Sequence, residues 1–233
     1  MHPIRKAALL LAGLLGFSIT CAAQMQVGGV PINELPRYGG ARKTKAALKA
    51  DQAFLADCDQ RFPSRDSAAR AMLAAGWQHL SQQQYPTAIK RFNQAWLLDS
   101  TNAGVYWGFG AWCGIQGRHD ASVYFLERSR RAGIRDPSLL ADLGNTLLRR
   151  YDELHVPTDL DRSIAYLKEF LDRATPNDQQ AVSVYTNLSI AHYRKRDYAQ
   201  AWTYVAKVEA LAPGALAPGY LDALQQAYPR PAK

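Results

Sequence analysis

Small and apolar residues recur at intervals of three and four along most of the chain, which places them on one face of an α-helix. A clear example is the run Tyr85, Ala88, Phe92 and Ala95, with spacings of 3, 4 and 3 residues. The run follows an apolar stretch that contains Gly76, and this arrangement is typical of a second helix that packs on a first. The pattern therefore predicts that pairs of α-helices make up the body of the chain.

The helical pattern repeats with a period of 34 residues, and four copies follow one another. The third copy regains its register only after about seven extra residues, an insertion from Arg150 to about Pro157. The copies occupy residues 69–102, 103–136, 137–181 and 182–215. Because each helix pair needs neighbours to bury its apolar face, the predicted fold class is an all-α helical-repeat solenoid.

The repeated residues resemble the tetratricopeptide repeat family. That family has a large residue at position 4 of each copy, Gly or Ala at 8, Tyr at 17, Ala at 20, an aromatic residue at 24, Ala at 27 and Pro at 32. The matching residues are Met72, Gly76, Tyr85, Ala88, Phe92 and Ala95 in the first copy, and Tyr185, Ser189, Tyr198, Ala201 and Pro213 in the fourth. The resemblance implies a tetratricopeptide-type solenoid of about four helix pairs, whose backbones approach closely where small residues meet.

Segments of different composition flank the repeats. Residues 43–63 have apolar side chains at helical spacing, so we expect an N-terminal capping helix there. Residues 24–42 hold six glycines and prolines without a sustained period, which predicts an extended arm. Residues 216–233 predict a C-terminal capping helix and tail. Caps of this kind cover the end faces of a repeat array.

Residues 1–23 have the order of a secretory signal peptide. Arg5 and Lys6 precede an uncharged, largely apolar run, which ends in small residues. Cleavage after Ala23 would start the mature chain at Gln24. The sequence therefore predicts an exported protein of the periplasm.

Cys21 supports an alternative, because bacterial lipoproteins are cut just before a cysteine that then carries lipid. Ser18 and Thr20 depart from the Leu and the Gly or Ala that usually stand at these positions. The alternative protein would be an outer-membrane lipoprotein that acts as a scaffold of envelope or pilus machinery.

Composition narrows the function classes further. The chain has 48% hydrophobic and 21% charged residues, near the averages of globular proteins, which excludes collagen-like, wholly disordered and multispan membrane proteins. Its net charge of +8 is compatible with an anionic partner. A basic nucleic-acid-binding repeat protein is a further alternative. The export signal disfavours it, and the sequence has no Lys or Arg stripe interleaved with aromatic residues.

Several residues suggest chemistry that the repeat register explains more simply. The glycines between residues 108 and 114 imitate a nucleotide-binding loop, but Gly110 stands at position 8 of a repeat helix. Cys113 stands at position 11, a packing position, and His119 opens the following helix. No two histidines have the His-x-x-x-His spacing that would hold zinc. We therefore expect no catalysis, no cofactor and no metal.

Cys58 and Cys113 would meet an oxidising compartment after export. Cys58 lies on the predicted N-terminal capping helix and Cys113 on the first helix of the second copy, with the first copy between them. A disulfide needs Cα atoms within about 7 Å of each other. The sequence is compatible with two free thiols and with a disulfide between them. We expect free thiols unless the capping helix folds across the groove.

In the tetratricopeptide family, residues at positions 2, 5, 9, 12 and 13 of the first helices point into a concave groove. Carried over residue by residue, the resemblance implies a site made of Leu73, Trp77, Leu80, Trp107, Ile115, Asn145, Arg149, Tyr193 and Arg194. Trp77 and Trp107 are expected on one concave wall, where truncation would cost little stability. The alternative is that the two rings only cover the capping helix.

The lining of this groove predicts the chemistry of its partner. One half is aromatic and apolar, and the other adds an amide and two cationic groups, so an extended peptide with an acidic group would complement it. The sequence thus predicts a non-enzymatic adaptor or assembly scaffold of the bacterial cell envelope, whose partner is an unknown envelope protein or peptide. No small-molecule substrate is expected, and membrane contact is expected only if Cys21 carries lipid.

Overall fold

The computed structural model describes residues 25–231, so the predicted signal peptide and Cys21 lie outside the described residues. Among these residues a two-stranded antiparallel sheet and two 3-10 helices precede ten α-helices. The first four elements are β1 (Gln26–Val27), β2 (Val30–Pro31), η1 (Ile32–Glu34) and η2 (Pro36–Gly40). The α-helices are α1 (Lys45–Arg61), α2 (Arg65–Ser81), α3 (Tyr85–Leu98), α4 (Ala103–Ile115), α5 (His119–Arg131), α6 (Ser138–Leu154), α7 (Pro157–Arg173), α8 (Asp178–Arg194), α9 (Tyr198–Leu211) and α10 (Pro218–Ala227).

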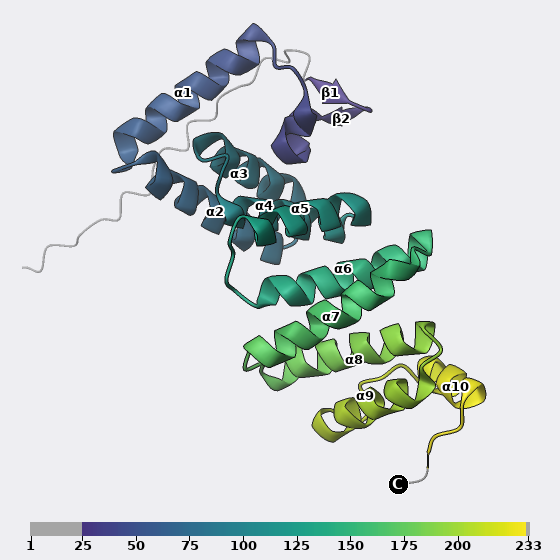
Figure 1. Ribbon diagram of the computed structural model, residues 1–233. Coiled ribbons are helices and arrows are strands. Elements are labelled where there is room, and N and C mark those ends of the chain that lie inside the picture. The colour runs from purple at the N-terminus through teal and green to yellow at the C-terminus, as the bar shows by residue number, and fades with distance from the viewer. Residues whose placement is uncertain (1–24, 232–233) are drawn as a thin grey trace, which may run out of the picture.

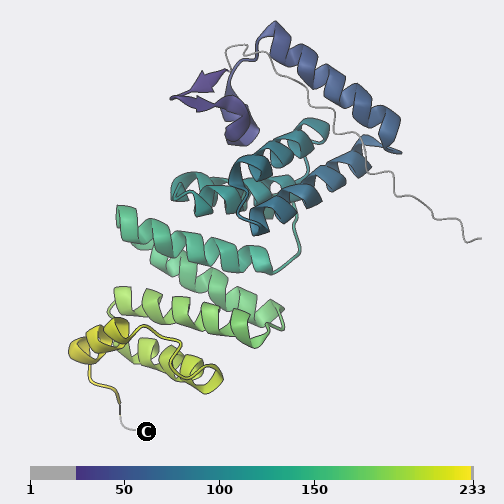
Figure 2. The same ribbon diagram turned by 180° about the vertical axis from the view of Figure 1, so that it is seen from behind.

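The helices from α2 to α9 form four pairs of sequence neighbours, α2–α3, α4–α5, α6–α7 and α8–α9, and each pair stacks on the next (Figure 1). β1 and the end of the described chain lie at opposite ends of the stack, as the view from behind also shows (Figure 2). This arrangement confirms the predicted fold class, an all-α helical-repeat solenoid.

Glycines of the first helices lie directly under large side chains of the second helices, both within a pair and between neighbouring pairs. A Cβ atom added at Gly76 would come within 2.4 Å of the Phe92 ring, and one added at Gly108 within 2.6 Å of the same ring. Gly110 lies under Leu126 and Gly144 under Leu167 in the same way. The glycines are therefore required by the close approach of the helices and leave no space for a side chain.

Serine hydroxyls join positions 8 and 20 in three of the pairs. Ser122 donates to the carbonyl of Gly110 at 2.8 Å, and Ser163 donates to the carbonyl of Gly144 at 2.7 Å. In α8–α9 the direction reverses, because Ser189 at position 8 donates to the carbonyl of Ala201 at position 20, at 2.9 Å. Each small polar residue thus fits the close approach and also satisfies its own buried hydroxyl.

The insertion in the third copy is helical and lengthens the α6–α7 hairpin. It extends α6 as far as Leu154, and His155 then adopts the left-handed conformation that ends the helix. Arg150 fixes the extension, because its guanidinium donates to both oxygens of the fully buried Asp159, at 2.7 and 2.6 Å. A two-point bond of this kind needs the fixed fork geometry of arginine.

Residues 25–40 are folded against α3, which contradicts the expectation of an extended arm. Ile32 and Leu35 are buried, and the side-chain amide of Asn93 donates to the carbonyls of Asn33 and Leu35 at 3.0 and 2.9 Å. The two buried apolar side chains and the amide of Asn93 therefore hold the segment on α3, and its carbonyl groups bond to protein where they would otherwise bond to water. We call residues 25–43 the N-terminal segment below.

One helix lies at each end of the stack. Cys58 in the last turns of α1 packs with Ala68 and Leu98, so α1 contacts the first pair near its own C-terminal end. At the other end Leu224 of α10 is fully buried against α9. Among residues 25–231 no helix is both long enough and apolar enough to span a membrane.

Replacing Phe92 with Ala tests the packing of the first pair. Phe92 is fully buried between Gly76 and Gly108, so Phe92→Ala should lower the free energy of unfolding by about 3 to 5 kcal/mol. Tyr124→Ala, at a ring that is 49% exposed, is the control and should cost less than about 1 kcal/mol. Urea denaturation measures both, and equal losses would contradict the packing described here.

Candidate interaction groove

A pocket with a volume of about 570 Å³ lies between the first helices of the first three pairs. Its walls come from α2, α4, α5 and α6, and five predicted site residues line it: Trp77, Leu80, Ile115, Asn145 and Arg149. One wall is apolar because α4 presents Ala111, Gly114 and Ile115 to it, while α6 presents polar side chains. Four helices from three successive pairs thus build one site.

Trp77 and Trp107 lie together, as predicted for one concave wall. Their rings meet edge to face with centroids 5.5 Å apart, and Trp77 makes the same kind of contact with Phe92. The indole N–H of Trp107 donates to Asp142 Oδ2 at 2.7 Å. Trp107 also packs against the cluster that contains buried Leu143, so it joins the second pair to the third.

These contacts contradict the expectation that neither tryptophan holds helix to helix. Each ring is half-buried, and Trp107 couples α4 both to α2 and to α6. Truncation of Trp107 would leave the carboxylate of Asp142 without its donor, which costs more than the lost contact area alone. The two rings therefore hold the first helices together, Trp77 in the wall of the pocket and Trp107 beside it.

Asp142 carries the one acidic group among the residues that line this pocket. Burial raises the pKa of its carboxyl to about 6, the hydrogen bond from Trp107 opposes the shift, and the negative charge of Asp136 adds to it. The carboxyl therefore titrates close to neutral pH. Since Trp107 occupies Oδ2, the other oxygen remains available to a donor from a partner.

Arg149 supplies the positive charge of the pocket. Its side chain is exposed, and no carboxylate lies within ion-pair distance of it among residues 25–231. Asn145, one turn earlier on α6, is also exposed and offers both a donor and an acceptor. The groove thus combines an apolar wall with a free guanidinium, an amide and a carboxyl.

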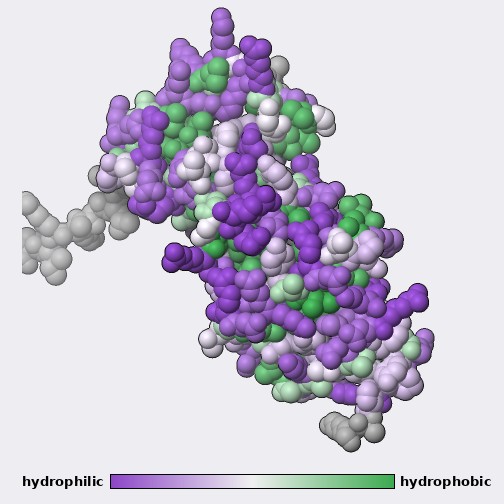
Figure 3. Space-filling model, viewed as in Figure 1, coloured by the Kyte–Doolittle hydropathy of each residue, from purple (hydrophilic) through white to green (hydrophobic). Residues whose placement is uncertain are grey.

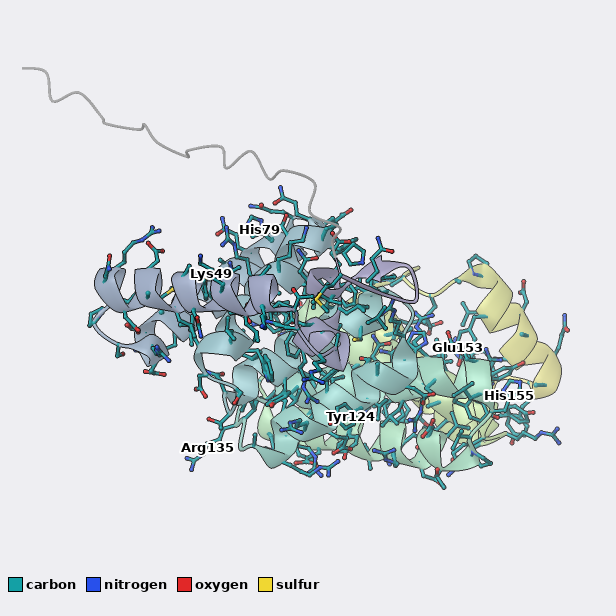
Figure 4. The ribbon with its side chains drawn as sticks, turned by 90° about the horizontal axis from the view of Figure 1, so that it is seen from above. Lys49, His79, Tyr124, Arg135, Glu153 and His155 are labelled. Atoms are coloured by element: carbon teal, nitrogen blue, oxygen red, sulfur yellow. The ribbon has the colours of Figure 1, made fainter. Side chains whose placement is uncertain are left out.

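His119 and Glu153 border the groove where the α6–α7 hairpin extends beyond α5. His119 Nδ1 lies 2.9 Å from Glu153 Oε1. Glu153 and His155 lie at the same end of the molecule, on the opposite side from Arg135 (Figure 4). The inserted residue Glu153 therefore pairs with His119, which is one of the residues that line the pocket.

Four predicted site residues lie outside the pocket, two of them far from it. Tyr193 packs against Tyr198 and Tyr220 in the C-terminal core, with ring centroids 5.8 and 5.7 Å away. Arg194 pairs with Asp152, at 3.0 Å between Nε and Oδ1, so its charge is already compensated. Tyr193 and Arg194 therefore make contacts within the chain and do not line this pocket, and their place in the groove stays a prediction. The other two are Leu73, which packs into the core of the first pairs, and Trp107, which stands beside the pocket.

Sequence reasoning missed Asp142 and His119 as lining residues. A signal for Asp142 was present, because it is the one charged residue in the otherwise uncharged stretch from 138 to 148. A lone carboxylate on a helix face rich in leucine usually has a specific donor. Nothing comparable marked His119, whose position depends on the length of α6.

Cysteine and metal chemistry add nothing to the groove. Cys58 and Cys113 are both free and buried. Burial raises the pKa of the Cys113 thiol to about 12, which keeps it protonated. Among residues 25–231, no cluster of three His, Cys, Asp or Glu side chains could hold a metal ion.

The surface around these elements is mainly hydrophilic. On the face seen in Figure 3, hydrophobic residues form several separate patches among charged and polar ones. Ile115 is one of the exposed large hydrophobic residues, at 50% exposure, and it lies in the groove. An exposed apolar side chain inside a concave site is a natural contact for a partner.

No protein-family model and no curated protein sequence matches the chain. Among solved structures, PilF of Pseudomonas aeruginosa is similar, with a TM-score of 0.53 and 18% identity over 70% of this chain and 75% of that chain. YrrB, described as a TPR protein with an unusual peptide-binding site, gives a TM-score of 0.46 and 15% identity, covering 71% of this chain and 95% of that one. At this identity, similarity concerns the fold. Together with the repeat register, the fold is that of a tetratricopeptide-type helical-repeat protein.

The titration of Asp142 should appear in the stability of the protein. Its pKa of about 6 in the folded chain lies above the ordinary value for Asp, so its favourable contribution is complete at low pH and is lost as the pH rises through 6. Asp142→Asn keeps an acceptor for Trp107 but cannot ionise. Relative to Asp142→Asn, the wild-type chain should lose about 1 to 3 kcal/mol of unfolding free energy between pH 4 and pH 7.

Urea denaturation of the two proteins at four pH values gives this difference. Asp222→Asn, at an exposed position of α10, is the control and should differ from wild type by a constant amount. A constant difference for Asp142→Asn as well would show that folding does not raise the pKa of Asp142.

Proposed function

We propose that the chain is a non-enzymatic interaction module that binds an extended peptide segment of a partner protein in the groove between α2, α4 and α6. The observation that carries the proposal is the coexistence, in one pocket of about 570 Å³, of an apolar wall and the unpaired guanidinium of Arg149. A free arginine beside exposed apolar surface is the usual composition of an interaction hot spot.

The groove matches a peptide in three respects. The wall of Leu80, Ala111 and Ile115 accepts an apolar side chain. Asn145 and the free oxygen of Asp142 can satisfy backbone groups of an extended strand, which must find partners when they leave water. Arg149 can pair with a carboxylate of the partner. An acidic side chain next to an apolar one is therefore the preferred ligand.

The surroundings of Cys113 agree with the proposed binding role. Cys113 is protonated and lines a cavity on the other side of α4, away from the pocket that His119 lines. A catalytic thiol requires a base within hydrogen-bond reach. The groove residues accordingly act as contacts.

Selection of peptides on the full chain tests the groove. Peptides selected from a displayed library on wild-type protein should bind Arg149→Gln and Ile115→Asp at least about tenfold more weakly, because one variant removes the cation and the other places a charge on the apolar wall. Arg131→Gln makes the same change of charge on α5 outside the pocket and should bind as wild type does. The contribution of Arg149 should also fall as salt is added.

Isothermal titration measures these affinities, and circular dichroism checks that each variant is folded. Equal affinity of wild type, Arg149→Gln and Ile115→Asp would place the binding surface elsewhere and overturn the proposal.

The second part of the proposal is that the chain works in the bacterial cell envelope after export. The support is the sequence of residues 1–23, in which Arg5 and Lys6 precede the apolar run. The intact mass of protein from cells that export it should correspond to a chain that begins at Gln24. A mass that includes diacylglycerol on Cys21 would establish the lipoprotein alternative, and a mass that begins at Met1 would contradict export.

A further inference from the structure

The N-terminal segment, residues 25–43, is held firmly on the far side of the helix pairs from the groove. Besides the two hydrogen bonds from Asn93, Lys90 Nζ lies 3.0 Å from Glu34 Oε1. Lys43 lies 3.2 Å from the centroid of the Tyr38 ring and 2.6 Å from Asp51 Oδ2 on α1. The segment is thus fastened to both α1 and α3, which is more than a linker requires.

Two adjacent residues of this segment are backbone-strained. Arg37 has φ 54° and ψ 34°, and Tyr38 has φ 55° and ψ 32°, the left-handed conformation that favours glycine. This conformation is unfavourable for a residue that carries a side chain. Strain of this kind persists only where the surroundings enforce it, and it is concentrated at functional sites. The turn holds Arg37 in place, so the contacts of Arg37 are where a function is expected.

A cavity with a volume of about 330 Å³ separates this turn from α4 and α5. Its lining is apolar apart from two arginines, and its residues are Leu35, Pro36, Arg37, Gly39, Gly40, Cys113, Arg118, Ala121 and Phe125. It is distinct from the groove, because Ala111 and Gly114 of α4 line the groove while Cys113 lines this cavity. One helix thus separates two sites.

The two arginines have no acidic partner among residues 25–231. Arg37 lies over the ring of Trp96 and Arg118 over the ring of Trp112, each 5.7 Å from the ring centroid. Nε of Arg37 is buried without a hydrogen-bond acceptor. Glu34, which lines the neighbouring cavity beside Arg118, is instead paired with Lys90. Two positive charges therefore face one cavity without compensation.

We propose that this cavity binds an anionic group, a carboxylate or a phosphate, that is attached to a compact apolar body. The guanidinium groups of Arg37 and Arg118 would hold the anion by charge-assisted hydrogen bonds, and Leu35, Pro36 and Phe125 would contact the apolar part. A volume of about 330 Å³ is at the lower end of small-molecule sites, so the apolar body is small. The strained turn is then explained because it places the side chain of Arg37 at this cavity.

The charge state of the cavity agrees with this assignment. Burial raises the pKa of the Cys113 thiol, which keeps the sulfur neutral and adds no negative charge to the lining. An unpaired buried guanidinium N–H is costly, and an anion from outside would satisfy it. The site is independent of the proposed peptide groove, so either can fail alone.

Titration of the full chain with simple anions tests the site. The probes are hexanoate, hexyl phosphate, inorganic phosphate and the neutral control hexanol, and the readout is the indole N–H signals of Trp96 and Trp112 in ¹⁵N-resolved NMR spectra. Because each indole lies beside one of the two arginines, an anion that draws in both guanidinium groups should shift both signals saturably. Hexanoate, hexyl phosphate or both should give this result, and the stronger of the two identifies the anion.

Substitutions separate specific binding from general charge effects. Arg118→Gln and Arg37→Gln should each weaken the binding about tenfold or more, while Arg42→Gln removes an exposed charge of the same segment outside the cavity and should leave it unchanged. Arg118 is exposed at the start of α5, so its variant tests the proposal even if Arg37→Gln disturbs the strained turn.

Three results would overturn the proposal. The first is a lack of saturable shifts with both six-carbon anions, and the second is binding of hexanol as tight as that of hexanoate. The third is an equal loss of binding in Arg42→Gln and Arg118→Gln. Inorganic phosphate that binds as tightly as hexyl phosphate would overturn the apolar half of the assignment.

Discussion

The close approach of paired helices is the constraint on which the rest of this structure depends. Phe92 fills the space between Gly76 of its own pair and Gly108 of the next, so one ring fixes both the spacing within a pair and the spacing between pairs. Further along the stack, Leu126 and Leu167 repeat the contact within the pair, over Gly110 and Gly144. A core packed this tightly has little freedom to relax, and the positions of the first helices follow from it.

The groove is a consequence of that spacing. Once α2, α4 and α6 are set side by side, Trp107 reaches both Trp77 and Asp142, and the pocket opens between them and Arg149. Under the proposed function, a partner would lie on the same three helices that these contacts hold in place. Rigid contact surfaces of this kind bind with less loss of conformational entropy than flexible ones.

The resemblance to the tetratricopeptide repeat family implied that Trp77 and Trp107 share one wall. Local periodicity predicted the helices and the repeat register, because small and large residues that pack within a pair lie at fixed separations in the sequence. It failed where distant segments meet. Asn93 bonds to residues 60 and 58 positions earlier, so composition alone predicted a loose arm where the structure has an anchored one.

The same contrast between locally determined positions and contacts with distant segments holds for the groove. Arg149 lies in the pocket because its register holds, whereas Arg194 is paired with Asp152 on the part of α6 that the insertion extends. The number of extra residues was visible in the sequence, but not the helical extension they form. Asp142 was missed because its role depends on a donor 35 residues away.

The central claim is that the concave surface of α2, α4 and α6 is the site of partner binding. A crystal structure of the chain with a selected peptide bound tests it most directly. The account predicts a peptide in extended conformation across these helices, with an apolar side chain against Ile115 and a carboxylate at Arg149. A peptide bound on α3, α5 and α7, or along α1, with the groove unoccupied, would contradict it.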